Sequence, residues 1–384
     1  MFENVDLLVC GAGPVGSLLA ERAASQLGWR VLVLDRRAHV AGNCHDGPAK
    51  NGVLVHSYGP HYFRTNDDAL LKYLSRFSDF VPANYEVRSQ VRGELLPFPI
   101  NLDTLERFFG TKLDAESAEA LLASKRVPIA RPANSEEFVL SRVGRELYEA
   151  FYLNYTLKQW GVHPRDLDAS VCGRVPVRLC RDSRYVNHTH QVMPRRGFTT
   201  LFASMLKHPR IRVELNCYFG EVRDLVRPRF ATVYTGPVDE YFGHRFGRLP
   251  YRSLKFEFET RREAFAQPCV QINYPNEREY TRSVEIKHVT GQRHPETAVC
   301  YETPTNTGEP FYPVPRRESA ALYARYKELA DAETARRAVY FCGRLAQYRY
   351  FNTDEVLLEA LACFETIRRR FAGARASSPQ VSAA

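Results

Sequence analysis

The residues of this chain that are best suited to chemistry gather between positions 151 and 185. The stretch contains FYLNYTLKQW at 151–160, RVPVR at 174–178 and RDSRY at 181–185, so it interleaves aromatic rings with arginines. Flat rings stack on a nucleobase, and guanidinium groups bind phosphate oxygens through paired hydrogen bonds. This one segment therefore holds the types of side chain that are needed to bind a sugar nucleotide.

A dinucleotide-binding pattern opens the chain. The spacing predicts a β-α-β unit, with a strand at 5–10, the turn GAGPVG at 11–16, a helix at 17–26 and a second strand at 31–34. Gly11, Gly13 and Gly16 allow a tight turn that brings the amino end of the helix to a pyrophosphate. Asp35 ends the second strand, 24 residues after Gly11, where a carboxylate reaches the adenosine ribose. We therefore expect a bound dinucleotide.

NAD and FAD both use this unit, so the following residues must discriminate between them. Asp35 and Arg36 run into HVAGNCHD, where Gly42 and Asn43 resemble a second glycine element of flavoproteins, which favours FAD. Far downstream, an apolar strand at 338–341, the string CGRL and a helix at 354–371 are typical of a chain that returns to its first sheet. The cofactor domain is therefore predicted to be discontinuous in sequence.

The middle of the chain divides into two parts. Residues 102–159 carry apolar residues at spacings of three and four, which predicts a helical insertion. Between 251 and 312, stretches such as SLKFEFET at 253–260 and VEIKHVT at 284–290 alternate, which predicts antiparallel strands.

Composition excludes several classes of protein. No stretch approaches the roughly 18 apolar residues of a membrane span, and the first residues lack a cationic leader, so we expect a cytoplasmic protein. The nine cysteines form no C-x-x-C pair, which argues against disulfides and metal sites. The formal charge of +9 comes without any long basic run, so small polyanions are better partners than nucleic acid.

Several further strings, taken in order, carry a resemblance to a known family. They are YGPHYF at 58, NYTLKQWG at 154, RVPVR at 174, YTGPVDEYF at 234, RFGRLPYRSLKFE at 245, EYTR at 279, EPFYPV at 309 and GRLAQYRY at 343. Over about residues 4–371 the chain resembles the UDP-galactopyranose mutases, which are flavin-dependent isomerases. A shared dinucleotide fold alone does not account for so many independent matches.

The resemblance implies a fold and a division into domains. The expected fold class is α/β, with a discontinuous FAD-binding Rossmann-like domain, a helical-bundle insertion and a twisted antiparallel sheet. The ranges implied are 1–60, 197–245 and 320–371 for the FAD domain, 100–178 for a helical domain with a mobile substrate loop, 61–99, 179–196 and 246–319 for the sheet domain, and 372–384 for a disordered tail.

The resemblance also implies an activity. The enzyme would interconvert UDP-galactopyranose and UDP-galactofuranose, or a related nucleotide-linked hexose, without net oxidation or reduction. N5 of reduced FAD would attack the anomeric carbon, so FAD would be needed in its reduced form and a cellular reductant, NAD(P)H or a flavin reductase, would keep it so. The resemblance further implies a homodimer.

Residue roles follow from the same resemblance. The implied catalytic residues are His61 beside the flavin, Arg174 and Arg282 on the diphosphate, Trp160 near the sugar, and Arg64. The implied substrate-binding residues are Asn84, Phe151, Tyr152, Tyr155, Thr156, Tyr185, Asn273, Tyr312 and Tyr350. The implied cofactor-binding residues are Gly11, Gly13, Gly16, Asp35, Arg36, Gly42, Asn43, Tyr58, His61, Gly343, Arg344 and Leu345. No metal is expected.

This chain departs from the family pattern around the sugar. Arg64 stands in place of a second loop histidine, Glu86 and Arg88 add charges to a usually neutral stretch, and Asn352 replaces a carboxylate; other replacements are Ala41, Cys342 and Gln347. Added positive charge motivates the hypothesis that the sugar is a modified or acidic hexose, paired with Arg64 or Arg88.

Two readings from other classes stay open. The first is an FAD-dependent oxidoreductase of the amine-oxidase type, which would share GAGPVG and the late glycine strand but would not need paired arginines for a diphosphate. The second is a nucleotide-sugar binding protein that retains the cleft without the chemistry. The consumption of reductant and the turnover of substrate discriminate among the three.

Overall fold

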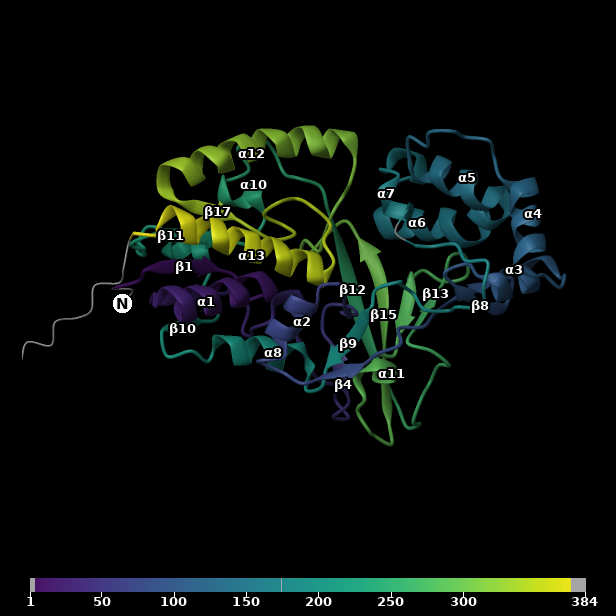
Figure 1. Ribbon diagram of the computed structural model, residues 1–384, viewed down its shortest axis with the longest axis horizontal. Helices are drawn as coiled ribbons and strands as arrows, with labels where there is room; N and C mark the ends of the chain where they lie inside the picture. Colours follow the sequence, from purple (N-terminus) through teal and green to yellow (C-terminus); the bar gives the residue numbers. More distant parts are fainter. Residues whose placement is uncertain (1–3, 174, 374–384) are drawn as a thin grey trace, which may run out of the picture.

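The computed structural model describes residues 4–173 and 175–373 of the chain. Figure 1 shows a layered region of sheet and helices that contains the first and last described residues, a long central sheet, and a group of helices beyond it. One apolar cluster runs from Leu7 and Phe198 of the layered region to Leu105 and Leu147 of the helical group. The three regions therefore share a continuous core.

The layered region is built on a parallel sheet of five strands. Its order is β10 (Ile211–Glu214), β2 (Val31–Leu34), β1 (Leu7–Cys10), β11 (Ala231–Tyr234) and β17 (Val339–Phe341). Every residue of β1 and β2 is buried, as expected for parallel strands with both faces covered. These strands come from three separate stretches of sequence, so the predicted discontinuous Rossmann-like fold is confirmed.

Helices cover both faces of this sheet. The face of Leu7 and Val9 packs in a cluster with residues of α1 (Pro14–Leu27), α8 (Gly197–Leu206) and α13 (Thr353–Arg370). On the other face, Leu8 and Cys10 pack near α10 (Val238–Tyr241), and Figure 1 shows α12 (Arg317–Arg337) beyond it. Among the described residues, no helix combines the length and the apolar character needed to cross a membrane.

The central sheet has seven strands. The order is β16 (Tyr312–Pro313), β12 (Tyr251–Arg261), β15 (Thr297–Thr305), β14 (Arg282–Val284), β13 (Gln271–Asn273), β7 (Val87–Val91) and β8 (Glu94–Phe98). The alternating stretch at 253–260 lies in β12, as predicted, and pairs with β15. The sheet is not wholly antiparallel, because β7 and β13 run parallel.

The strand predicted at 284–290 is wrong beyond Val284. Residues Lys287–Thr290 form the short helix α11 instead. The alternation misled because its polar residues are buried: Glu285 accepts hydrogen bonds from Ala266 N and Gln267 N, and the Lys287 ammonium donates to main-chain carbonyls. Polar side chains that fix loops do not mark a solvent-facing side of a strand.

The remaining strands are short. β5 (Phe63–Thr65), β9 (His190–Pro194) and β6 (Phe80–Pro82) form one small sheet, and β3 (Asp46–Pro48) pairs with β4 (Leu54–His56). Two further helices are short. In the order of the chain, α2 (Asp68–Leu74) follows β5, and α9 (Phe219–Val222) follows β10 of the parallel sheet.

The predicted helical insertion is present. Its helices are α3 (Leu102–Phe109), α4 (Ala115–Lys125), α5 (Ser135–Leu147), α6 (Asn154–Trp160) and α7 (Ser170–Gly173), with a π-helical segment at Tyr148–Leu153. Reciprocal caps begin two of these helices, Asn101 with Thr104 on α3 and Asp114 with Ser117 on α4. The π-helical segment widens the helix just before α6, and such segments are frequent at functional sites.

The carboxyl-terminal helix α13 ends at Arg370, and Ala372 and Gly373 form a turn after it. The disordered tail was predicted for 372–384, of which residues 374–384 lie outside the described residues.

Candidate active site

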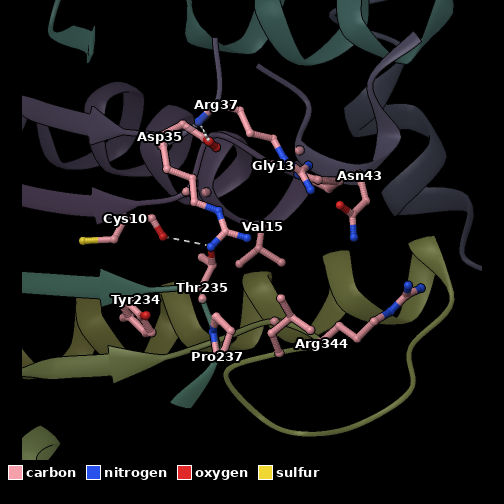
Figure 2. A pocket seen from close by; sticks show the side chains of 18 of the residues that line it. Cys10, Gly13, Val15, Asp35, Arg37, Asn43, Tyr234, Thr235, Pro237 and Arg344 are labelled. Atoms are coloured by element: carbon pink, nitrogen blue, oxygen red, sulfur yellow. Dashed lines mark hydrogen bonds between the residues drawn. The ribbon is translucent and has the colours of Figure 1, made fainter. Parts of the chain in front are cut away.

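A cavity of about 220 Å³ lies at the carboxyl ends of the parallel strands. Figure 2 shows Asp35, Gly13 and Asn43 on its amino-terminal wall, with Thr235, Pro237 and Arg344 on the facing wall. Almost all of the predicted cofactor-binding residues line it: Gly11, Gly13, Gly16, Asp35, Arg36, Gly42, Asn43, His61, Gly343, Arg344 and Leu345. We call it the cofactor cavity.

The glycines of this cavity fit a dinucleotide. A Cβ atom at Gly11 would lie 2.0 Å from Thr235 Oγ1, and one at Gly16 would lie 1.8 Å from the carbonyl oxygen of Gly11. The chain therefore approaches itself too closely for any side chain. Among the described residues no side chain caps the amino end of α1, so its N–H groups at Val15 and Gly16 remain for a pyrophosphate.

Asp35 is held by the main chain around it. Its Oδ2 accepts a hydrogen bond from Ala12 N at 2.8 Å, and its Oδ1 accepts one from Arg37 N at 2.8 Å. The carboxylate thus ties the turn after β1 to the turn after β2, and each oxygen keeps a lone pair for a ribose hydroxyl.

Tyr58 does not line the cofactor cavity. Its hydroxyl is 2.7 Å from His39 Nε2, and the Arg37 guanidinium lies 4.1 Å from the centre of its ring. Arg37 also pairs with Glu309 at 2.5 Å. Tyr58 therefore packs against the loop after β2, at His39 and Arg37, and not against the cofactor cavity.

A second cavity, of about 240 Å³, adjoins the first. The two share the lining residues His61, Arg344, Phe351, Asn352 and Thr353. The second is also lined by eight predicted substrate-binding residues: Phe151, Tyr152, Tyr155, Thr156, Tyr185, Asn273, Tyr312 and Tyr350. We call it the substrate cavity, and it lies between the helical group and the central sheet.

Arg282 is the best-held cation of the substrate cavity. Glu302, which is fully buried and lies opposite it on β15, accepts from its Nη2 at 2.7 Å and from its Nε at 2.8 Å. Burial alone would lower the pKa of Arg282, but the Glu302 carboxylate and the nearby Tyr155 hydroxyl raise it well above its usual range. The guanidinium is therefore charged at any working pH and is fixed on the cavity wall.

Aromatic rings line the same cavity as Arg282. Tyr312 and Tyr350 stack with centroids 5.7 Å apart, and Trp160 contacts both edge-on at 6.3 and 6.5 Å. The Arg344 guanidinium lies 5.2 Å from the Tyr312 ring and 5.1 Å from the Tyr350 ring. The predicted Trp160 therefore reaches the cavity wall, where it packs against two predicted phosphate-binding tyrosines.

His61 lines both cavities, and its contacts define its protonation state. Its Nδ1 lies 3.0 Å from the carbonyl oxygen of Gly59, so Nδ1 carries the proton, and Nε2 is an acceptor that no described residue uses. Its main-chain N–H donates to His56 Nδ1 at 2.9 Å. Burial lowers the pKa of His61 to about 3, so the ring is neutral and accepts hydrogen bonds near pH 7.

Arg64 also lines the substrate cavity. Its Nη2 donates to Asn352 Oδ1 at 2.7 Å, and its buried Nε has no hydrogen-bond partner among the described residues. Arg88, by contrast, lines neither cavity and pairs with Glu86 at 2.9 Å. The geometry thus keeps Arg64, and not Arg88, as a cation that can meet a sugar.

Two predicted site residues are not placed in the substrate cavity. Asn84 is exposed and lines neither cavity, whereas its buried neighbour Tyr85 lines the substrate cavity. The predicted Arg174 lies outside the described residues.

Four residues with clear roles in the geometry escaped the sequence reasoning: His56, Tyr85, Gln271 and Glu302. The stretch VQIN offered one signal, because Gln271 and Asn273 are two apart and so share a face of a strand. Glu302 could not be found in that way, since its contact with Arg282 depends on the register of two strands.

Comparison with known proteins agrees with this geometry. A family model described as UDP-galactopyranose mutase matches residues 150–350, and one described as an NAD(P)-binding Rossmann-like domain matches residues 9–77. The chain is 36% identical to a probable UDP-galactopyranose mutase of Klebsiella pneumoniae, over 94% of each chain. It is 33% identical to a dTDP-fucopyranose mutase of Escherichia coli, over 93% of this chain and 97% of the other.

Solved structures show the same fold. A reduced UDP-galactopyranose mutase superposes with a TM-score of 0.73 at 14% identity, over 95% of this chain and 96% of that one. A putrescine oxidase variant superposes less well, with a TM-score of 0.56 at 12% identity, over 95% of this chain and 99% of the other. The similarity to the oxidase extends to the fold and does not bear on the chemistry.

Proposed function

Because the chain belongs to the UDP-galactopyranose mutase family, a family of flavin-dependent isomerases, we propose that it interconverts the pyranose and furanose forms of a nucleotide-linked hexose. The observation that carries this proposal is the pair of adjoining cavities, one with a dinucleotide cradle and the other with a fixed arginine among aromatic rings. UDP-galactose is the first substrate to test, because the Klebsiella pneumoniae relative and the best-superposed structure described above are both named UDP-galactopyranose mutases.

FAD fits the cofactor cavity, and in its reduced form it supplies an electron-rich ring nitrogen that can bond to an anomeric carbon. The glycine turn and the amino end of α1 would bind its pyrophosphate, and Asp35 would bind its ribose. His61 lines both cavities, and its Nε2 would accept a proton from a group bound in either one.

The substrate cavity binds the nucleoside diphosphate. Arg282 holds the diphosphate oxygens and stabilises the negative charge that develops when the bond to the sugar breaks. The Tyr185, Tyr312 and Tyr350 hydroxyls donate to the same oxygens, and Arg174 joins them by family resemblance alone. Phe151, Tyr152 and Tyr155 form the wall for the base, with Thr156 and Asn273 beside them. Trp160 and the paired rings exclude water from the sugar.

The test is turnover by the reduced enzyme. The protein is purified with FAD, reduced with dithionite and incubated with UDP-galactose, and the products are separated by chromatography and identified by NMR. We expect UDP-galactofuranose to form while the reductant is used in catalytic amounts. Consumption of oxygen or NAD(P)H in proportion to substrate would instead identify an oxidoreductase of the amine-oxidase type. A protein that binds UDP-galactose but converts no nucleotide sugar would be a binding protein.

A second candidate substrate is a nucleotide-linked sugar that carries a modified or acidic group. The observation in its favour is Arg64, a cation in the substrate cavity whose only hydrogen-bond partner among the described residues is the neutral Asn352. UDP-galacturonate and dTDP-fucose are compared with UDP-galactose in the same assay, for the natural protein and for Arg64→Met. If the acidic sugar is the substrate, it has the highest kcat/KM, and Arg64→Met lowers that value selectively.

We further propose a cytoplasmic homodimer whose FAD is reduced by NAD(P)H or by a flavin reductase, with residues 100–178 as the domain that carries the substrate loop. These points rest on the family resemblance. Analytical ultracentrifugation tests the dimer, and anaerobic flavin bleaching by NADH and NADPH tests the reductant.

A further inference from the structure

Three buried polar side chains form a chain of hydrogen bonds in the floor of the substrate cavity. They are Tyr85, Gln271 and Asn273, which are only 4%, 4% and 5% exposed. Gln271 and Asn273 lie two residues apart on β13 and so share its cavity-facing side. Asn273 pairs across the sheet with Arg282, which places its amide next to the fixed cation.

The direction of these hydrogen bonds is determined by the tyrosine. Its hydroxyl lies 2.8 Å from Gln271 Oε1, and among the described residues this oxygen is the one hydrogen-bond acceptor within its reach. Burial raises the pKa of Tyr85 well above its usual range, so the phenol keeps its proton. A buried O–H without an acceptor costs more free energy than one that donates, so Tyr85 must donate to Gln271.

The orientation of both amides follows from that donation. Since Gln271 Oε1 receives the tyrosine proton, Gln271 Nε2 points the other way and donates to Asn273 Oδ1 at 2.7 Å. The Asn273 oxygen is therefore occupied. Its Nδ2 takes part in none of the hydrogen bonds among the described residues, and so the amide presents N–H donors to the cavity.

We propose that Tyr85 and Gln271 are positioning residues that lock Asn273 as a hydrogen-bond donor, and that Asn273 thereby selects a ligand with an acceptor atom at this point. Resting on the proposed function, the acceptor is a carbonyl oxygen of a pyrimidine base or an oxygen of the diphosphate. We call the two hydrogen bonds from Tyr85 to Gln271 and from Gln271 to Asn273 the relay. Without the relay, the Asn273 amide turns freely and presents either its oxygen or its nitrogen to the cavity. The relay thus sets specificity through a polarity that the shape of the cavity alone would not provide.

The experiment measures the dissociation constants of UDP, CDP and inorganic pyrophosphate on the FAD-loaded protein, from the change in flavin fluorescence or by calorimetry. The variants are Tyr85→Phe, which removes one hydroxyl, and Gln271→Leu, which breaks the relay. Tyr62→Phe is the matched control, because the Tyr62 ring packs 4.9 Å from that of Tyr85 while its hydroxyl donates to Gln191 outside the relay.

We expect Gln271→Leu to weaken UDP binding about tenfold, as for the loss of one directed hydrogen bond, and Tyr85→Phe to weaken it by a smaller factor in the same direction. CDP carries an amino group where UDP has a carbonyl oxygen. If the acceptor is the C4 carbonyl of the base, the preference for UDP over CDP falls towards one in both variants, and pyrophosphate binds as before. If it is the C2 carbonyl, which both bases carry, UDP and CDP lose affinity by the same factor, and pyrophosphate again binds as before. If it belongs to the diphosphate, all three ligands lose affinity by the same factor.

Unchanged affinities in both variants, or equal losses in Tyr62→Phe, would overturn the relay. A natural protein that binds neither UDP nor CDP would overturn the proposed function as well, so the two failures are distinguishable. Gln271→Glu adds a readout that packing alone does not move. An ionised Glu has the same shape but can only accept hydrogen bonds, from both Tyr85 and Asn273. Asn273 must then turn its N–H groups away from the cavity and towards the Glu. We therefore expect a larger loss of UDP affinity than in Gln271→Leu.

Discussion

Arg282 owes both its charge and its orientation to Glu302. Two hydrogen bonds of 2.7 and 2.8 Å join the guanidinium to one carboxylate oxygen, and the pair closes one wall of the substrate cavity. A guanidinium presents several donors in a fixed plane, whereas an ammonium offers a single point of charge. Contacts between single residues therefore determine how a diphosphate is held. Burial of single residues also determines which groups stay neutral, as His56 and His61 show.

Replacing Arg282 by Lys tests the guanidinium geometry. We expect kcat/KM for the nucleotide sugar to fall about 100-fold, because the lysine keeps the charge but loses the paired hydrogen bonds to Glu302 and the diphosphate. Steady-state kinetics of the reduced enzyme give the value. Arg88→Lys is the control, since Arg88 pairs with Glu86 outside both cavities. Wild-type kinetics for Arg282→Lys would refute the assignment.

His56 makes stability depend on pH. It is 4% exposed, and burial lowers its pKa from 6.5 to about 3. Between these values the unfolded chain binds a proton that the native state does not, so the free energy of unfolding falls as pH falls, by about 1.4 kcal/mol per pH unit. His56→Asn retains an acceptor for the His61 N–H but does not titrate.

The measurement is urea unfolding of both proteins at pH 7 and pH 5. From pH 7 to pH 5 the natural protein should lose about 2 kcal/mol more than His56→Asn, because 1.5 of those two units lie below the unfolded pKa. His61 titrates in both proteins, and so does Asp46, whose pKa burial raises and whose effect has the opposite sign. An equal loss in both proteins would mean that His56 has the same pKa in the native and the unfolded states.

The helix α6 shows how an element carries site residues into position. Arg252 of β12 is 4% exposed and donates to the carbonyl oxygens of Lys158 and Gln159 at 2.9 and 3.0 Å, in the last turn of α6. A cation at the carboxyl end of a helix satisfies free carbonyls and complements the helix dipole. Trp160 ends this helix, so a strand of the central sheet holds the tryptophan that lines the substrate cavity.

The turn between β1 and α1 yields a prediction about two glycines of one motif. A Cβ at Gly16 would lie 1.8 Å from the Gly11 carbonyl, whereas a Cβ at Gly13 would lie 3.6 Å from its nearest neighbour, Gly42 Cα. We expect Gly16→Ala to lower the free energy of unfolding by about 2–3 kcal/mol and to abolish FAD binding, because α1 must move off β1. Gly13→Ala should leave the stability of the apoprotein within about 1 kcal/mol yet weaken FAD binding, since Gly13 lines the cofactor cavity.

Urea unfolding of the apoproteins and titration with FAD separate these effects. Equal stability of the two variants would show that the packing of α1 on β1 does not require a glycine at position 16.

At the scale of the whole molecule, both cavities are assembled from stretches far apart in sequence. The cofactor cavity draws on the turns after β1 and β2, on the residues after β11 and on the turn after β17. The substrate cavity adds the helical group through Tyr155, the central sheet through Arg282 and a small sheet through Arg64. A ligand in either cavity therefore links regions that the chain connects only through long excursions.

Removing FAD should consequently weaken the whole fold. A ligand that binds only the native state stabilises it by about 2.7 kcal/mol when the free ligand concentration is 100 times its Kd. At 1,000 times the Kd the stabilisation is about 4.1 kcal/mol. We expect the apoprotein to melt several degrees below the loaded protein, with a Tm that rises with added FAD. Thermal melts at increasing FAD test this, with riboflavin as the control because it lacks the diphosphate and adenosine. A Tm independent of FAD would contradict the assignment of the cavity.

The sequence alone predicted those parts of the fold that depend on local chemistry. The spacing of Gly11, Gly13 and Gly16 required a strand, a tight turn and a helix, and β1, α1 and β2 lie within a few residues of the expected limits. Most of the predicted site residues line one of the two cavities, because short motifs keep their local geometry. The prediction failed at 284–290, where buried polar residues imitate the alternation of a strand.

Only the tertiary structure decided which side chains meet. Arg282 finds Glu302 through the register of β14 on β15, Arg64 meets Asn352 across 288 residues of sequence, and Tyr85 rather than Asn84 faces the substrate cavity. Such contacts depend on how sheets and helices pack, and a shift of one residue along a strand would turn each side chain to the opposite face. The sequence determined the kind of chemistry, and the packing determined the charges and the hydrogen-bond polarity around the sugar nucleotide.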